Sequence, residues 1–484
     1  MWKVSNNSLL RIMHKSNIVE KIGYGLGDMS SSMFWKIFSY YLPFFYSNIF
    51  GLRLVDAGIL VLITRIWDAV SDPMMGIIAD RTHTRWGKYR PYLLWVAPFF
   101  SLVGILLFTT PDLHYTGKLV WAYATYLLMM TVYTAINVPY GAMLGVMTAD
   151  SEEKTIFSSY RMFFAYAGSF IALAAWEPLC RLFQGMNFSL QTNWQLSMVV
   201  IAAACLVLFI LCFLLTKERL HTVSTVSVGK DIKSLMHNGP WWILIVAALC
   251  FNLFCTVRGA TVAYYFSDII GFNQYLRLGE WSVLFYAGLF LGIGEIANMA
   301  GVMLTVPIAK HLGKKTTFIA VNMGLVGLSI LFFFIPVSPP GFWLILLLQV
   351  LISVLTGIMS PLIWSMYADV SDYAEYKFHT ASTGLIFSSS SMAQKFGGAF
   401  GGAAVLWLLA SCEYIVRTDA QMTAQVAILQ TDQAQMCLRA LMSFIPAGVA
   451  LLSIIVCRMY SLTTQKMGAI NEELAKKRQI ETKY

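Results

Sequence analysis

Two acidic residues lie one helical turn apart in a mostly apolar stretch of the chain. Asp68 and Asp72 are four residues apart, a spacing that places both carboxylates on one face of a helix. In a low-dielectric interior such a pair repels unless a cation or a proton lies between the two groups. Because oxygen ligands suit hard cations, the pair indicates a Na⁺ or H⁺ site. The alternative is that both acids neutralise Arg65 or other buried bases as structural ion pairs.

A second apolar segment offers more oxygen groups beside a proline. Thr134 and Asn137 precede Pro139, and a proline inside a helix removes one backbone hydrogen bond and bends the helix. Oxygen atoms beside the bend could complete the shell of a bound cation. Packing and hydrogen bonding between membrane helices is the alternative for these residues.

Basic and polar residues in other apolar segments suggest a cavity for a polar molecule. Arg161 and Lys395 each need a carboxylate or a polar ligand inside a membrane. Arg and Lys donate hydrogen bonds to sugar hydroxyls, and aromatic rings stack on the apolar face of a sugar. Packing, structural hydrogen bonding or snorkelling is the alternative. The further candidates are Trp67, Tyr140 and Trp364 for stacking, and Asp28, Ser30, Ser31, Ser32, Asn252 and Arg258 as polar lining.

The composition places all these residues in a membrane protein. Of 484 residues, 58% are hydrophobic and 12% are charged, whereas soluble domains contain about 25% charged residues. Apolar runs near the ~20 residues that an α-helix needs to cross a bilayer recur along the chain, without the alternation of barrel strands. We therefore expect an all-α membrane protein with twelve transmembrane helices, near residues 24–50, 57–79, 91–110, 119–147, 157–178, 195–216, 241–266, 281–309, 316–336, 342–368, 383–411 and 440–457.

The distribution of charge predicts the orientation of the chain. Of its 34 Lys and Arg residues, 23 lie in the N-terminal segment, the even-numbered connections and the C-terminal tail, and 6 lie in the odd-numbered connections. This asymmetry predicts that both termini are cytoplasmic, so the net charge of +9 does not indicate a nucleic-acid partner. The N-terminal segment lacks the pattern of a cleavable signal peptide. The cysteines form no CxxC pair, so neither a zinc site nor a disulfide framework is indicated.

The longest polar connection divides the chain into two halves. We predict a six-helix half at residues 1–216, a cytoplasmic linker at 217–239, a second six-helix half at 240–460 and a cytoplasmic tail at 461–484 that contains a short surface helix. Gly87-Lys88 and Gly313-Lys314 follow spans two and eight, 226 residues apart. Such a repeat predicts pseudo-symmetric halves. Parallel halves with the substrate between them near the midplane are the layout of the major facilitator fold.

The same repeat suggests a single cation site. Glu295 and Asn298 stand at the repeat positions of Ala69 and Asp72. The pair of carboxylates is therefore not duplicated in the second half.

The chain resembles the glycoside-pentoside-hexuronide:cation symporters, a family of the major facilitator superfamily typified by the melibiose carrier. The resemblance covers about residues 20–480. Its matching segments are Gly23 to Asp28, Trp67 to Gly76, Arg85 to Pro91, Asn137 to Tyr140, Ser159 to Arg161, Ala368 to Tyr376 and Gln394 to Gly397.

The resemblance implies roles for particular residues. Asp68 and Asp72 match the family's cation-binding carboxylates, and Ser71 and Thr134 fall where neighbouring cation ligands lie. Arg161 and Lys395 resemble basic positions of the family's sugar pathway, and Ser390 and Ser391 fall near its polar sugar contacts. Three positions depart from the melibiose carrier: Ser32 and Asn137 replace carboxylates that bind a galactosyl group, and Gly141 replaces a stacking tryptophan.

From the resemblance we expect a secondary active transporter rather than an enzyme. A glycoside, pentoside or hexuronide would move together with Na⁺ or H⁺ by alternating access, without another cofactor. The expected setting is a monomer in the bilayer of a bacterial cytoplasmic membrane. Two alternatives remain: a sodium-coupled lysolipid carrier of the same fold, and a sugar sensor that does not transport.

Overall fold

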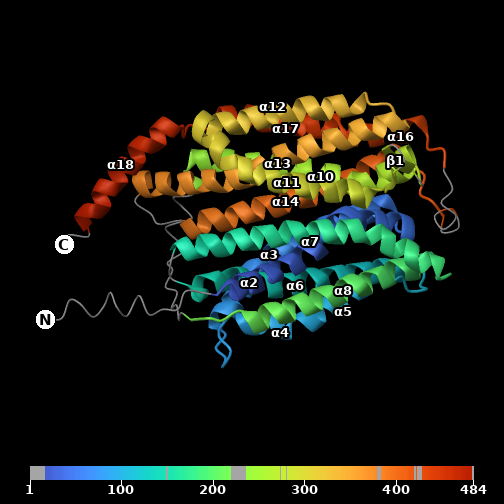
Figure 1. Ribbon diagram of the computed structural model, residues 1–484, viewed down its shortest axis with the longest axis horizontal. Coiled ribbons are helices and arrows are strands. Elements are labelled where there is room, and N and C mark those ends of the chain that lie inside the picture. The colour runs from blue at the N-terminus through green and yellow to red at the C-terminus, as the bar shows by residue number, and fades with distance from the viewer. Residues whose placement is uncertain are drawn as a thin grey trace.

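The computed structural model describes residues 17–148, 151–219, 236–272, 274–278, 281–378, 383–418, 421 and 428–481. The predicted linker at 217–239 therefore lies mostly outside the described residues. In Figure 1 the blue to green helices, α2 to α8, form one half of the bundle, and the yellow-green to red helices from α10 onward form the other.

The first half contains α2 (Ile18–Phe44) with its π-helical extension η1 (Phe45–Ile49), α3 (Leu54–Arg81), α4 (Arg90–Trp95), α5 (Ala97–Leu107), α6 (Tyr115–Met147), α7 (Ser151–Gly185) and α8 (Leu190–Leu215). The second half begins with α10 (Gly239–Tyr265), its extension η2 (Phe266–Ile270), the strands β1 (Gln274–Leu278) and β2 (Trp281–Phe285), α11 (Ala287–Leu312) and α12 (Lys314–Phe333). It continues with α13 (Pro339–Phe378), α14 (Thr383–Ser411), α16 (Asp432–Met442), α17 (Phe444–Arg458) and α18 (Thr464–Glu481).

Membrane-spanning character is distributed through both halves. Within the described residues, eight helical segments are long and apolar enough to cross a bilayer: α6, most of α7, α8, α10 with η2, α11, α12, α13, and α16 with α17. The other expected spans correspond to α2, α3, the α4–α5 pair and α14. These carry more charged or small polar residues, or contain a break. The helical expectation is confirmed, and the arrangement is consistent with twelve spans.

Local structure differs from the expectation at three places. Residues 281–285 form strand β2, which pairs antiparallel with β1, rather than the start of a helix. The third expected span breaks at Val96, two residues before Pro98. The twelfth breaks at Ser443, three residues before Pro446. Proline cannot donate the backbone hydrogen bond that continues a helix, which explains both breaks.

The two ends of the bundle are distinct. The strands β1 and β2 and helix α16 lie at one end, called here the hairpin end, and α18 lies at the opposite, tail end (Figure 1). Helix α18 is more than a solvated surface helix, because Met467, Ile470 and Leu474 are buried in a cluster with α13. Its helical character was expected, but its apolar face is covered.

Hydrogen bonds join the two halves at the hairpin end. They link Ser47 to Tyr264 at 2.7 Å, the Tyr286 hydroxyl to the Ala174 carbonyl at 2.7 Å, and the Trp407 indole N–H to the Val55 carbonyl at 3.3 Å. This end of the interface is therefore closed in the structure.

Two glycines let α11 and α13 approach each other at backbone distance. A Cβ atom at Gly301 would lie 2.1 Å from the Val354 carbonyl oxygen, and one at Gly357 would lie 2.3 Å from the Asn298 carbonyl oxygen. Backbone atoms cannot move aside as a flexible side chain can. These helices therefore require glycine at both positions.

We predict that Gly301→Ala lowers the melting temperature of the purified protein by several degrees, because overpacking of this kind costs about 1–3 kcal/mol. The control is Gly327→Ala, since a Cβ atom there meets nothing within 4 Å. Equal melting temperatures for the two variants would show that the α11–α13 contact is not tight.

Candidate cation and substrate site

The two predicted acids lie at the boundary between the halves. Asp68 and Asp72 come from α3, which contacts α6 of the same half and α14 of the other. The Thr134 hydroxyl of α6 lies 3.1 Å from one Asp68 oxygen and 3.0 Å from one Asp72 oxygen. Ser71 lies 3.2 Å from the Thr134 hydroxyl. The structure thus brings together all four residues of the predicted cation site.

A lysine from the other half pairs with both acids. Lys395 of α14 places its ammonium nitrogen 3.2 Å from Asp68 Oδ2 and also forms an ion pair with Asp72 Oδ2. Asp68 is fully buried, whereas the Asp72 side chain is 30% exposed. The sequence placed Lys395 on the sugar pathway, but its observed position is at the acids.

Arg65 supplies a second positive charge near this group. Its guanidinium is buried and lies 4.2 Å from the centre of the Trp35 ring. Arg65 is close enough to Asp68 to act on it electrostatically. Among the described ion pairs, both acids pair with Lys395 and neither pairs with Arg65. The alternative of structural ion pairs with buried bases is therefore met through Lys395.

The predicted sugar-binding arginine is also paired. Arg161 of α7 donates to Asp28 of α2 at 3.0 Å, and its guanidinium carbon lies 5.3 Å from the centre of the Tyr140 ring. Tyr140 is buried, stacks on Tyr24 and donates its hydroxyl to the Tyr24 carbonyl at 2.6 Å. Tyr140 thus forms a wall behind Arg161 rather than an open stacking surface.

The remaining predicted polar residues do not converge on one point. The Asn137 and Asn252 amides bond to carbonyls of their own helices, at 3.1 and 2.9 Å. Ser32 and Ser391 are half-buried in α2 and α14. The Ser390 side chain lies outside the described part of the structure. Their roles in substrate binding stay predictions.

Arg258 has a structural task that the sequence did not reveal. It donates to the Met442 carbonyl at 2.5 Å and to Gln349 Oε1 at 3.1 Å. In a continuous helix the Met442 carbonyl would accept from residue 446, but Pro446 has no N–H. Arg258 therefore satisfies the carbonyl that the break between α16 and α17 leaves free.

A polar cavity of about 200 Å³ lies between the halves. The first half contributes Lys36 and Tyr40 of α2 and Tyr166 of α7. The second half contributes residues of α10, α11 and α13: Phe251, Arg258, Glu295, Asn298, Gln349, Ser353 and Thr356. Neither Lys36 nor Glu295 was predicted as a substrate-site residue. A base and an acid inside apolar segments were the signal in the sequence that could have identified them.

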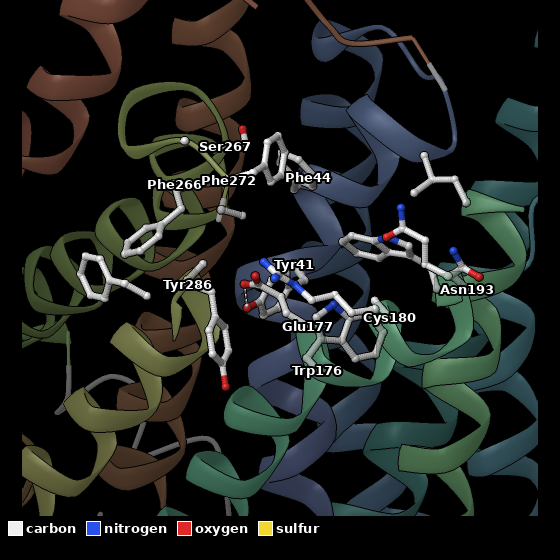
Figure 2. A pocket seen from close by; sticks show the side chains of 18 residues that line it. Tyr41, Phe44, Trp176, Glu177, Cys180, Asn193, Phe266, Ser267, Phe272 and Tyr286 are labelled. Carbon is white, nitrogen blue, oxygen red and sulfur yellow. Dashed lines mark hydrogen bonds between the residues drawn. The ribbon is translucent and has the colours of Figure 1, made fainter. Parts of the chain in front are cut away.

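A second cavity, of about 110 Å³, lies nearer the hairpin end. Figure 2 shows aromatic side chains from both halves around it, with Glu177 near its centre. The Glu177 carboxylate accepts from the Tyr41 hydroxyl at 2.9 Å and from the Gly288 backbone N–H at 3.1 Å. Gly288 lies in the first turn of α11, where N–H groups lack partners within the helix. Glu177 therefore caps a helix of the opposite half.

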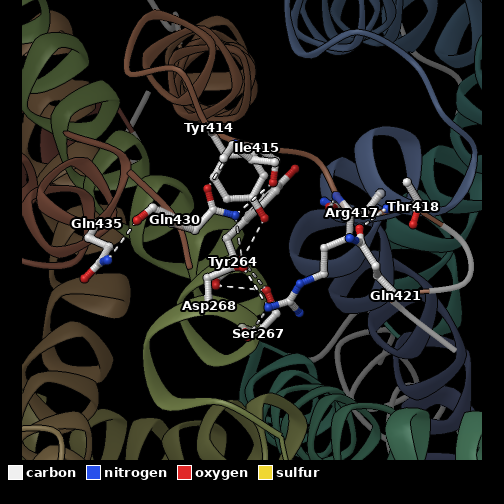
Figure 3. A network of polar contacts seen from close by, with 11 residues as sticks. Tyr264, Ser267, Asp268, Tyr414, Ile415, Arg417, Thr418, Gln421, Gln430 and Gln435 are labelled. Atoms are coloured by element: carbon white, nitrogen blue, oxygen red, sulfur yellow. Dashed lines mark hydrogen bonds and ion pairs between the residues drawn. The ribbon is translucent and has the colours of Figure 1, made fainter. Parts of the chain in front are cut away.

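A polar network covers the hairpin end of the second half. Figure 3 shows Asp268 at its centre, with an ion pair to Arg417 at 2.8 Å and hydrogen bonds from Tyr414 at 2.7 Å and Gln430 at 3.2 Å. The Arg417 backbone N–H also donates to Asn48 of the first half at 3.4 Å. The network anchors the segment after α14 to the end of α10.

The fold is that of known membrane transporters. A mutant of the nucleoside transporter NupG superimposes with a TM-score of 0.65 over 92% of this chain and 100% of its own, at 11% identity. A bacterial homologue of the lysosomal transporter Spinster, in an inward-facing and occupied conformation, gives 0.64 over 95% and 98%, at 10% identity. At such low identity these likenesses show the fold alone.

The family follows from the sequence match. The model of the family described as MFS/sugar transport protein matches residues 23–464, so the chain belongs to this family of transporters. The expected major facilitator fold and transport role, rather than an enzymatic one, are confirmed.

Similar proteins include two from Escherichia coli (strain K12). The inner membrane symporter YicJ is 34% identical over 461 residues, which are 95% of each chain. The putative glycoside/cation symporter YagG is 34% identical over 471 residues, which are 96% of each. The isoprimeverose transporter of Lactiplantibacillus pentosus is 32% identical over 84% of this chain and 83% of its own.

We predict that Lys395→Met destabilises the purified protein, because it leaves Asp68 buried without its partner. Breaking a buried ion pair in this way costs about 3–5 kcal/mol. Combining Lys395→Met with Asp68→Asn and Asp72→Asn should restore most of the melting temperature.

The control is Lys315→Met, because the Lys315 ammonium donates only to the carbonyls of Arg458 and Tyr460 among the contacts described for it. If the triple variant is as unstable as Lys395→Met, the lysine acts through packing rather than charge.

Proposed function

We propose that this chain is a symporter that carries a sugar or glycoside together with a cation by alternating access. The observation that carries the proposal is the group of Asp68, Asp72, Ser71 and Thr134, which presents several oxygen atoms to one point between the halves. Relatives named as a glycoside/cation symporter and an isoprimeverose transporter support a sugar cargo over a lysolipid.

The ammonium of Lys395 occupies the position that the transported cation would take. It brings one positive charge to the two acids, as a coupling ion would, so the acid pair is not left without an ionic partner between transport cycles. A Na⁺ ion or a proton that binds the acids would release Lys395 from them. Because α3 and α14 belong to different halves, this release weakens one connection between the halves.

Sugar and cation would bind to one linked equilibrium. If the cation raises the affinity for sugar by some factor, the sugar must raise the affinity for the cation by the same factor. The contacts at the hairpin end support a state that is closed there. With both termini in the cytoplasm, as the basic residues predict, the hairpin end lies on the opposite side of the membrane, so the structure is closed toward that side.

We further propose a monomer in a bacterial cytoplasmic membrane, with the two halves at 1–216 and 240–460 as its moving bodies and the tail from 461 in the cytoplasm. The name of the relative described as an inner membrane symporter supports this location. Either Na⁺ or H⁺ is compatible with two carboxylates and two hydroxyls.

We expect Asp68→Asn or Asp72→Asn to abolish uptake against a concentration gradient in proteoliposomes, while membrane insertion is unchanged. Each variant removes a charge that would attract the ion. Thr134→Val should lower the apparent cation affinity by roughly tenfold, the effect of one hydrogen-bonding group.

Thr131→Val is the matched control, since Thr131 lies on the same helix and contacts Trp67 rather than the acids. Uphill uptake at the full rate in both aspartate variants would refute the cation site.

A further inference from the structure

The central cavity contains an ion pair that joins the two halves. Lys36 of α2 donates to Glu295 Oε1 of α11 at 2.6 Å and to the Tyr40 hydroxyl at 3.3 Å. Glu295 is 3% exposed, and the Lys36 side chain is 22% exposed. Both residues line the cavity, and neither belongs to the acid group around Asp68.

One oxygen of this pair has no hydrogen-bond partner in the part of the chain that the structure describes. Glu295 Oε2 is buried and accepts no hydrogen bond from any residue that the structure describes. A buried carboxylate oxygen without a donor is costly. Because this oxygen lies in a cavity wall, a ligand with a hydrogen-bond donor, such as a hydroxyl group, could bind to it.

Donors for such a ligand lie close by. An ammonium has three N–H groups, and the described contacts of Lys36 use two of them. Asn298 uses its carbonyl oxygen to accept from Thr356 at 2.8 Å, and Gln349 uses its carbonyl oxygen to accept from Arg258. The described contacts leave both side-chain NH₂ groups in the cavity wall able to donate.

The open acceptor in the cavity wall belongs to an acid, which favours a ligand that donates hydrogen bonds over an anion. Lys36 and Glu295 cancel each other. Arg258 is directed to the Met442 carbonyl and Gln349, and its guanidinium carbon lies 5.1 Å from the centre of the Phe332 ring. Hydrogen bonds to neutral carbonyl groups leave the Arg258 charge in place, but they direct two of its N–H groups to the helix break and to Gln349. A carboxylate placed at Glu295 Oε2 would instead meet a like charge.

We propose that Lys36 and Glu295 form a hydroxyl-binding pair for a neutral sugar ring, with Glu295 Oε2 accepting from one hydroxyl and Lys36 donating to a neighbouring one. The inference rests on the proposed transport of a sugar and assigns the residues and the charge class of that substrate. Asn298 and Gln349 bind further hydroxyls, and the rings of Tyr40, Tyr166 and Phe251 cover the apolar face. Because Lys36 and Glu295 come from different halves, one ligand contacts both.

The test measures binding of neutral methyl pentosides and methyl hexosides, and of the matching hexuronides, to the purified full-length chain by calorimetry. The neutral glycoside that the wild type binds most tightly is then titrated into the variants. We expect Glu295→Gln and Lys36→Met to weaken this binding about tenfold or more, the effect of losing a charge-assisted hydrogen bond. The shift of melting temperature on adding the coupling cation should persist in both variants.

The matched control is Glu20→Gln, which removes an ion pair of the same 2.6 Å length with Arg219 outside the cavity. Its affinity for the glycoside should equal that of the wild type. If either cavity variant fails to fold, Asn298→Ala tests the same wall without breaking an ion pair and should also weaken binding.

A charge reversal, Lys36→Glu with Glu295→Lys, distinguishes a pair that binds the sugar from a pair that only holds α2 and α11 together. If the pair only braces the helices, the reversal restores the affinity that the single variants lose, and the inference is wrong. Full affinity in Glu295→Gln, or tighter binding of a hexuronide than of every neutral glycoside, also overturns it. If the wild type binds no sugar at all, the proposed function itself fails.

Discussion

Among the described residues, ion pairs cross the boundary between the two halves at two places, and each half supplies one lysine to the acids of the other. Lys395 of the second half pairs with Asp68 and Asp72 of the first, and Lys36 of the first pairs with Glu295 of the second. A charge removed from water must be neutralised nearby, since an isolated buried ion costs several kcal/mol. The halves can therefore separate at these points only when something else neutralises the acids or replaces the hydrogen bonds.

This constraint connects the fold to transport. At the hairpin end the halves are held mainly by neutral groups and by Glu177, which caps α11 across the boundary. If that end opens, water can form the hydrogen bonds that the first turn of α11 and the Glu177 carboxylate lose. The charged contacts nearer the middle are harder to replace. In the proposed mechanism, a cation replaces Lys395 at the acids, and a polyhydroxylated ligand replaces the hydrogen bonds between Lys36 and Glu295. This gives one physical reason for the two cargoes to move together.

The sequence predicted what depends on local pattern. Long apolar runs predicted the helices, and the spacing of Asp68 and Asp72, with the family resemblance for Ser71 and Thr134, predicted a group that the structure assembles. The position of Lys395 depends on how α14 packs against α3, about 320 residues apart in sequence, which no local pattern encodes. The same holds for Lys36 with Glu295 and for Arg258 with Met442. The strand β2 was missed because a short apolar run next to a helix has the same pattern in either conformation.

The most direct measurement is the structure of the full chain determined at a saturating concentration of the coupling cation and again without it. Cation binding at the acid pair predicts that Lys395 stays within 4 Å of both carboxylates only in the cation-free protein, and moves away from at least one of them once Na⁺ or a proton occupies the site. The cation site at Asp68 and Asp72 would be contradicted if Lys395 kept both ion pairs in the cation-saturated protein and the ion were bound elsewhere.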